Sequence, residues 1–370
     1  MFILMGLFAD LGGITNDVMR SMRAWLGRLP GGIACSVAMG CAGFAACTGS
    51  SAGATAVVGK MTIPEMLKSG YKPELATGVV AASGTLASLI PPSVLICVYG
   101  VLTDQPIGML LLAGFIPGIL SAIVYIGQII VRASIFPDLA PTNVEKATWS
   151  EKINSLRGLW GVVLIMGLIL GGIYTGVFTP TEAGALGALA AFIIALYRRR
   201  VTIQGLRASL LETVTTTCMI FFGLVGVLFL MRFLVLSGLL TLMLTTVATL
   251  EVNRWLIFGG MIAVYIILGC FIGAIGMMAI TLPVFFPIII SLGFDSLWFG
   301  IVIIKMCEIA LITPPVGVNC YITHNVAPEV PLEKIFSGIL PFLAMDILTL
   351  VLFCVFPQVV TWLPSMAMAS

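Results

Sequence analysis

Charged side chains are scarce in this chain. Only 9% of its 370 residues are Asp, Glu, Lys or Arg, whereas 60% are hydrophobic; a soluble protein carries about 25% charged residues. This composition excludes a soluble globular domain and predicts an all-α polytopic membrane protein. The formal net charge of +2 does not indicate nucleic-acid binding, because the basic residues lie in short loops between apolar runs.

Catalytic and metal-binding motifs are missing as well. The nine cysteines stand singly inside apolar segments, so we expect small buried side chains and no cofactor. The first nine residues lack the basic stretch and cleavage site of a secretory signal. Gly49 to Gly53 matches G-x-S-x-G, but that nucleophile needs a histidine base, and the one histidine, His324, lies in a predicted loop. An intramembrane enzyme is therefore disfavoured.

The chain does contain a proline phrase that occurs twice. Leu89-Ile90-Pro91-Pro92-Ser93 returns as Ile312-Thr313-Pro314-Pro315-Val316. Adjacent prolines remove backbone donors and clash with the preceding turn, so each apolar run is predicted to be two half-helices with an unwound middle. In lipid, open backbone survives only where protein or a water-filled cavity covers it. Two such breaks in one chain indicate a binding site at mid-depth in the membrane.

The spacing of the two phrases predicts an internal repeat. Pro314 follows Pro91 by 223 residues. The same offset aligns further proline and glycine positions: Pro64 with Pro287, Gly70 with Gly293 and, after one inserted residue, Gly114 with Gly338. Aligned proline and glycine positions are not expected from chance similarity between apolar runs. The helices near 158–176 and 182–197 would have partners before the first residue, so we expect the chain to be N-terminally incomplete.

Basic residues and apolar runs together predict the topology, because positive loops belong in the cytoplasm. Both flanks of residues 31–59 are basic, so this segment is predicted to be a re-entrant hairpin, and the two repeats come out inverted. In this arrangement 15 of the 18 Lys and Arg residues fall in cytoplasmic segments. The predicted order begins with a partial helix and a cytoplasmic surface helix over 1–30, the surface helix starting at Asp10. A first repeat core over 31–131 (hairpin 31–59, broken helix 75–102, helix 107–131) and a cytoplasmic loop over 132–157 follow. Scaffold helices and an outer surface helix are predicted over 158–250, where a basic loop that includes Arg207 precedes a span that starts at Glu212. The chain ends with a second repeat core over 251–370 (hairpin 256–292, broken helix 297–322, helix 335–362).

A hairpin tip that faces a broken helix brings several half-helix ends to the middle of the membrane. N-terminal ends favour an anion, whereas C-terminal ends and unwound carbonyls suit a small cation such as sodium. Uncharged side-chain oxygens that can complete a sodium shell are supplied by Ser50, Ser51, Thr85, Ser93, Thr313 and Asn319. The small residues of the first tip, Gly49 to Ser51, have a second interpretation, in which they only allow close helix packing.

A few charged residues lie inside apolar segments. Lys305 and Glu308 are three residues apart on one predicted helix, so they can share a face. A charged residue at that depth is a candidate for ion or substrate handling. The alternative, which we favour, is a structural pair in which Lys305 extends outward to the membrane interface. Asp346 and Arg232 are expected to be helix-packing or interface residues.

Several motifs together resemble the large (M-type) membrane subunit of tripartite ATP-independent periplasmic (TRAP) transporters. They are Gly49-Ser50-Ser51, Gly84-Thr85-Leu86, Ile90-Pro91-Pro92-Ser93, Leu282-Pro283 with Phe286-Pro287, and Leu311-Ile312-Thr313-Pro314-Pro315-Val316-Gly317-Val318-Asn319. The resemblance covers nearly the whole chain. It implies a sodium-driven importer of organic acids with an elevator-type fold of inverted repeats. It also implies two partners, a small four-helix membrane subunit and a periplasmic solute-binding protein.

Where the motifs match, the resemblance also implies which residues of this chain bind sodium and substrate. Sodium in the first repeat would be bound by Ser50, Ser51, Gly84, Thr85, Pro91 and Ser93. Sodium in the second repeat would be bound by Gly273, Thr313, Pro314, Gly317 and Asn319. The substrate would lie against Gly49, Ser50, Ser51 and Thr313. The chain departs from the family at the second tip, where the family often has an acidic residue and this chain has Gly273, and at Met306, where the family often has asparagine.

These observations lead to one functional hypothesis and one alternative. The chain is expected to be the permease subunit of a sodium-coupled, binding-protein-dependent importer in a bacterial inner membrane. C4-dicarboxylates, sugar acids and keto acids remain open as substrates, since no arginine is placed to identify one. The alternative is a stand-alone secondary carboxylate transporter that works without a binding protein.

Overall fold

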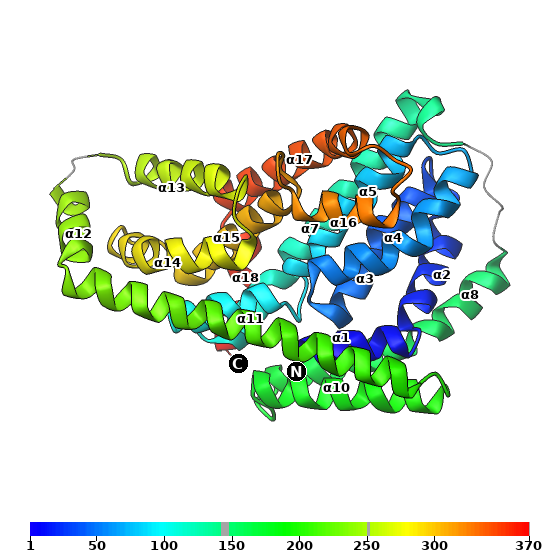
Figure 1. Ribbon diagram of the computed structural model, residues 1–370, viewed down its shortest axis with the longest axis horizontal. Helices are drawn as coiled ribbons and strands as arrows, with labels where there is room; N and C mark the ends of the chain where they lie inside the picture. Colours follow the sequence, from blue (N-terminus) through cyan, green and yellow to red (C-terminus); the bar gives the residue numbers. More distant parts are fainter. Residues whose placement is uncertain (142–147, 250–251, 370) are drawn as a thin grey trace.

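Every regular element in the described part of the chain is a helix. The computed structural model describes residues 1–141, 148–249 and 252–369 (Figure 1). Within these residues, six helices are long and apolar enough to cross a bilayer. The prediction of an all-α polytopic membrane protein is confirmed. Residues 142–147, in the middle of the predicted loop over 132–157, lie outside the described residues.

The first proline phrase interrupts a helix that follows a pair of helices. The elements in order are α3 (Gly32–Thr48), α4 (Ser51–Lys68), α5 (Pro73–Thr85), η1 (Leu86–Ser88), α6 (Val94–Thr103) and α7 (Ile107–Ile135). Between η1 and α6 the chain is unwound through Pro91-Pro92, as adjacent prolines require. Ser93 then begins α6, because its Oγ accepts a hydrogen bond from Ile96 N at 3.3 Å.

The same order of elements returns in the last third of the chain. These elements are α13 (Arg254–Gly269), α14 (Ala274–Ser291), α15 (Ser296–Ile312), α16 (Val318–Val326), α17 (Leu332–Val355) and α18 (Gln358–Ala369). Asp295 caps α15 by accepting a hydrogen bond from Trp298 N at 2.7 Å. The interruption between α15 and α16 contains Pro314-Pro315, and this peptide bond is cis, as is Pro91-Pro92.

The other helices of the described chain fall outside these two groups. They are α1 (Phe2–Leu11), α2 (Ile14–Leu26), η2 (Pro137–Leu139), α8 (Trp149–Leu156), η3 (Arg157–Leu159), α9 (Trp160–Tyr174), α10 (Pro180–Tyr197), α11 (Ile203–Leu236) and α12 (Leu239–Thr249). α1 and α2 meet at an angle of 71°. Figure 1 shows α11 crossing the molecule along one edge, from α1 and α10 to α12, and it contacts α14 on the way.

The predicted helix bounds differ most from the structure at three places. α4 continues to Lys68, beyond the predicted hairpin end at residue 59. α11 begins at Ile203 rather than Glu212, because the Thr202 hydroxyl caps it by accepting a hydrogen bond from Gly205 N at 3.1 Å. The helix predicted over 335–362 is two helices that part at Phe356-Pro357, since Pro357 cannot donate a backbone hydrogen bond.

Burial divides the helices into an inner and an outer set. α5 is buried without interruption from Leu75 to Thr85, and α15 is buried from Trp298 to Ala310. α11, in contrast, presents large apolar side chains such as Phe222, which is 83% exposed, as expected of a surface that faces lipid or another membrane subunit. The two interrupted helices therefore form the core of the molecule.

α5 and α17 approach each other at a pair of glycines. A Cβ atom built on Gly338 would lie 2.0 Å from the backbone oxygen of Glu74, and one built on Gly78 would lie 2.5 Å from the backbone oxygen of Gly338. These are main-chain atoms of packed helices, which cannot move aside as a flexible side chain would. Small residues are therefore required at this helix crossing.

Gly338→Ala is expected to lower the free energy of unfolding by about 1–3 kcal/mol, because it overpacks a helix contact that has no room for a methyl group. Thermal unfolding in detergent or nanodiscs measures the effect. The control is Gly127→Ala on α7, where an added Cβ would meet nothing within 4 Å, and its effect is expected to stay within about 0.5 kcal/mol. Equal unfolding temperatures for the two variants would contradict the close crossing.

Candidate functional site

A cavity of about 380 Å³ lies between the tips of the two helix pairs. The tip between α3 and α4 contributes Gly49, Ser50 and Ser51, and the tip between α13 and α14 contributes Gly273. The remaining lining includes Ser88, Val94, Leu311 and Val318 from the two interrupted helices, together with residues of α1 and α11. The structure thus brings both tips, and residues that flank both interruptions, to one cavity.

The first tip is packed directly against the first proline phrase. Gly49 has a φ of +58°, and a Cβ built on it would lie 2.3 Å from the backbone oxygen of Pro92. Val94 N donates a hydrogen bond to the Gly49 carbonyl at 3.2 Å. Ser50 caps α4 by accepting a hydrogen bond from Gly53 N at 3.3 Å. The tip and the break therefore satisfy part of each other's open backbone.

A side-chain contact joins the first tip to the second interrupted helix. Asn319, at the start of α16, donates hydrogen bonds from Nδ2 to Ser51 Oγ at 2.8 Å and to the Ala81 carbonyl of α5 at 3.1 Å. The sequence prediction placed Ser51 in one sodium set and Asn319 in the other. The structure places the two side chains in direct contact, so these residues form one cluster.

Other members of the first predicted set lie close behind the tip. A Cβ built on Gly84 would lie 1.9 Å from Thr55 Oγ1 and 3.3 Å from the Ser51 carbonyl. Thr85 is buried, and its hydroxyl donates to the Ala82 carbonyl at 2.7 Å. Ser93 is buried as well, and its hydroxyl donates to the Ser88 carbonyl at 2.5 Å. Pro91 is buried in the unwound segment between them.

The second predicted set is divided by the structure. Gly273 is exposed at the cavity, where an added Cβ would meet nothing within 4 Å. Thr313 donates its hydroxyl to the Ile309 carbonyl at 2.6 Å, and Gly317 begins α16 with a φ of +47°. The described residues that line the cavity do not include Thr313, Pro314 or Gly317. These three lie at the second break itself.

Three buried oxygens near the cluster have no hydrogen-bond partner in the described part of the chain. They are Ser83 Oγ, Ser88 Oγ and Asn319 Oδ1. Ser88 also lines the cavity, and Asn319 contacts Ser51. Buried polar atoms are normally paired, and uncharged oxygens of this kind are ligands that sodium takes at half-helix ends. The residues present therefore fit a small monovalent cation.

Two carboxylates of the cavity were missed by the sequence analysis. Asp10 of α1 and Glu212 of α11 line the cavity together with both tips. Glu212 was used only as the boundary of an apolar run, and Asp10 only as the start of a surface helix. The available signal was the presence of an acidic residue next to a long apolar stretch, where a carboxylate is costly unless it faces protein or water.

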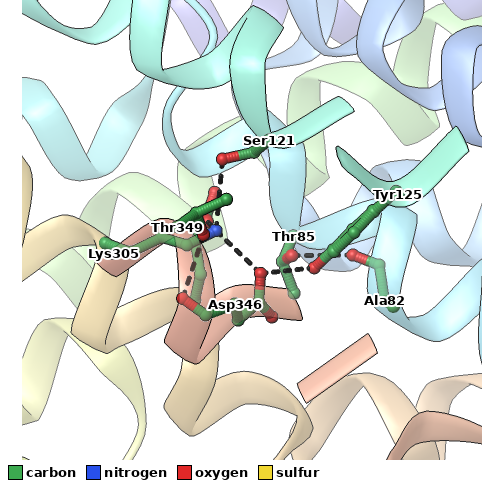
Figure 2. A network of polar contacts seen from close by, with 8 residues as sticks. Ala82, Thr85, Ser121, Tyr125, Lys305, Asp346 and Thr349 are labelled. Atoms are coloured by element: carbon green, nitrogen blue, oxygen red, sulfur yellow. Dashed lines mark hydrogen bonds and ion pairs between the residues drawn. The ribbon is translucent and has the colours of Figure 1, made fainter. Parts of the chain in front are cut away.

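Lys305 and Glu308 form the predicted pair, but the prediction that Lys305 extends outward is wrong. Lys305 does not extend to the membrane interface, because its side chain is 0% exposed and its ammonium pairs with Glu308 and Asp346. Asp346 is therefore an ion-pair partner rather than a simple packing residue (Figure 2). The sequence shows that Lys305 is flanked by apolar residues, but it does not show that α17 and α7 bring oxygen ligands to it. A buried lysine with such partners has no need to reach water.

The comparisons with known proteins agree on one family. A family model described as "Tripartite ATP-independent periplasmic transporter, DctM component" matches residues 1–359. The chain is 33% identical over 369 residues to the C4-dicarboxylate TRAP transporter large permease protein of Pseudomonas aeruginosa. That match covers 100% of this chain and 84% of the relative.

Other relatives carry different substrates in their names. The sialic acid TRAP transporter large permease protein of Vibrio cholerae is 29% identical, with 99% of this chain and 85% of the relative covered. The ectoine TRAP transporter large permease protein of Halomonas elongata is 30% identical, again with 99% and 85% covered. The similarity is therefore to large permease proteins as a class rather than to one substrate.

The two tips differ in how much space they leave for an added side chain, so the same substitution is expected to have different effects at Gly49 and Gly273. Gly49→Ser places a side chain on a residue in the left-handed backbone conformation, which costs about 1–2 kcal/mol of folding free energy. The added side chain also meets the Pro92 carbonyl. We therefore expect a lower unfolding temperature for this variant. Gly273→Ser adds the same side chain at the other tip, where there is room, and we expect an unfolding temperature close to that of the unmodified protein. Thermal unfolding of the two purified variants checks this. Equal destabilisation would contradict the packing of the first tip on the proline phrase.

Proposed function

The chain belongs to the DctM family of tripartite ATP-independent periplasmic transporters, and from that membership we propose that it imports organic acids coupled to sodium. The family consists of membrane-embedded large permease subunits and not of enzymes. This chain is accordingly a multi-pass membrane permease. The substrate class, the coupling ion and the transport mechanism are the proposed part.

The cavity between the two tips is the proposed substrate site, and its position is the observation that carries the proposal. α4 begins at Ser51 and α14 begins at Ala274, and both residues line the cavity. Helix N-terminal ends carry a partial positive charge and free N–H groups, which favour a carboxylate. Gly49, Ser50, Ser51 and, from the neighbouring break, Thr313 are the proposed substrate contacts.

Sodium is proposed to bind beside the cavity at the two interrupted helices. The first site is assigned to Ser50, Ser51, Gly84, Thr85, Pro91 and Ser93, and the second to Gly273, Thr313, Pro314, Gly317 and Asn319. Support comes from the unpaired buried oxygens of Ser83, Ser88 and Asn319 around the same cluster. Because Asn319 contacts Ser51 directly, binding at one site is expected to affect the other.

The two groups of helices are proposed to be inverted repeats that move together as an elevator-type unit. Support comes from the repeated order of helix pair, interrupted helix and long helix, and from the aligned prolines and glycines of the two segments. The proposed partners are a small four-helix membrane subunit and a periplasmic solute-binding protein. The proposed location is the bacterial inner membrane.

The function is tested by uptake of labelled organic acids into proteoliposomes that contain the permease, the small subunit and the binding protein. Uptake is expected to require an inward sodium gradient. Ser50→Ala and Thr313→Ala each remove one proposed ligand, so the sodium concentration for half-maximal uptake should rise about tenfold, which corresponds to about 1.4 kcal/mol.

The matched control is Ser291→Ala at the end of α14. Its hydroxyl also donates to a carbonyl of its own helix, Ile288 at 2.7 Å, but it does not line the cavity. Sodium dependence that is unchanged in Ser50→Ala and Thr313→Ala would refute the ligand assignment. Sodium-driven uptake that persists without the binding protein would favour the stand-alone carboxylate transporter instead.

A further inference from the structure

A buried ammonium lies between the two groups of helices. The Lys305 side chain is 0% exposed, and its Nζ contacts three oxygens: Asp346 Oδ1 at 2.7 Å, Glu308 Oε2 at 2.9 Å and Ser121 Oγ at 3.3 Å. Figure 2 shows Lys305 pointing toward Ser121 and Asp346. An ammonium has three donors, so all three are used.

The oxygens around this ammonium are held in place from three helices. Ser121 belongs to α7, Glu308 to α15 and Asp346 to α17. Tyr125 of α7 donates its hydroxyl to Asp346 Oδ1 at 2.7 Å, and its ring packs edge-on against Phe342 of α17. Asp346 is therefore held by a contact that does not involve Lys305, whereas Glu308 and Ser121 meet the ammonium from their own helices.

The shell has more acceptor capacity than one ammonium uses. Glu308 and Asp346 are both 0% exposed, and Glu308 Oε1 and Asp346 Oδ2 have no hydrogen-bond partner among the described residues. Two carboxylates and a hydroxyl around a positive charge, with further oxygens free, resemble the shell that proteins build for a hard cation. An unpaired carboxylate at this depth would be very costly.

The repeat proposed above explains where the charges come from. With the offset of 223 residues, Lys305 aligns with Ala82 and Glu308 aligns with Thr85, and after the one-residue insertion Asp346 aligns with Ala122. Figure 2 shows Ala82 and Thr85 beside Tyr125, with Asp346 between them and Lys305. All three charges thus come from the second copy, and the corresponding positions of the first copy are small or uncharged. Thr85 is itself one of the proposed sodium ligands.

We propose that Ser121, Glu308 and Asp346 form a monovalent-cation site whose occupant is the chain's own Lys305 ammonium. Because this cation is covalently attached, the site stays loaded whether or not sodium is present. It holds α7, α15 and α17 together throughout transport, and it needs no mobile ion. Removal of the ammonium leaves two buried carboxylates that recruit sodium from solution. The alignment with Thr85 rests on the proposed repeat, but the site itself does not.

The test is the response of the purified protein in nanodiscs to sodium, at constant ionic strength with choline as the replacement cation. Lys305→Met is expected to bind one more sodium ion per protein than the unmodified chain, measured with radioactive sodium. Its unfolding temperature is expected to be low in choline and to recover as sodium is added. A Lys305→Met protein that can be purified only in sodium-containing buffers also supports the proposal.

Two further variants separate this site from the proposed sodium sites at the cavity. Lys305→Met combined with Glu308→Gln and Asp346→Asn removes the carboxylates, so the additional sodium should disappear. Glu308→Gln alone keeps the Lys305–Asp346 pair, and its sodium binding should equal that of the unmodified chain. A loss of sodium binding in Glu308→Gln would overturn the proposal, because it would show that a mobile ion already occupies the site.

Two other outcomes also overturn it. One is a Lys305→Met protein that binds no more sodium than the unmodified chain. The other is a Lys305→Met protein that cannot be purified in any salt, since its carboxylates then cannot recruit a mobile cation. None of these measurements needs a substrate or a partner. If the unmodified chain binds no sodium at all, the proposed sodium coupling fails, whereas additional binding in Lys305→Met still supports the tethered cation.

Discussion

The requirement that backbone polar groups be satisfied away from water governs this structure. Two pairs of adjacent prolines interrupt helices in a chain of apolar runs, and an open backbone in lipid is tolerated only under protein cover. The first interruption is covered by the tip between α3 and α4, where Val94 N donates to the Gly49 carbonyl. Gly49 has no side chain, and this allows the two backbone segments to approach so closely. The cavity at the tips is a consequence of this packing.

The sequence was sufficient to predict the features that depend on local chemistry. Proline cannot donate a backbone hydrogen bond, so the positions of both interruptions follow from Pro91-Pro92 and Pro314-Pro315 alone. The turn at Gly49-Ser50 is local too, because glycine supplies the left-handed conformation and serine supplies the helix cap. Helix ends that rest on weaker signals were predicted less well, as for α11, whose first nine residues include Arg207 and were assigned to a loop.

Contacts between distant segments could not be predicted in the same way. Asn319 and Ser51 lie in different halves of the chain, and their hydrogen bond exists only because α16 packs against α4 and α5. Lys305 shows the same limit. A lysine in an apolar helix either reaches the membrane surface or finds partners inside, and the partner Asp346 lies on another helix, 41 residues along the chain. Sequence spacing identifies Glu308 as a neighbour but does not identify Asp346.

The electrostatics of the cavity bear on how an anion and a cation would bind together. Among the described residues that line it, two are acidic, Asp10 and Glu212, and none is Lys, Arg or His. An organic acid would therefore meet the partial charges of helix N-terminal ends and uncharged hydroxyls such as those of Ser50 and Ser51, and it would be repelled by the two carboxylates. The same carboxylates attract sodium. In the proposed mechanism, bound sodium supplies the positive charge that the side chains lack, so substrate and sodium stabilise each other's binding.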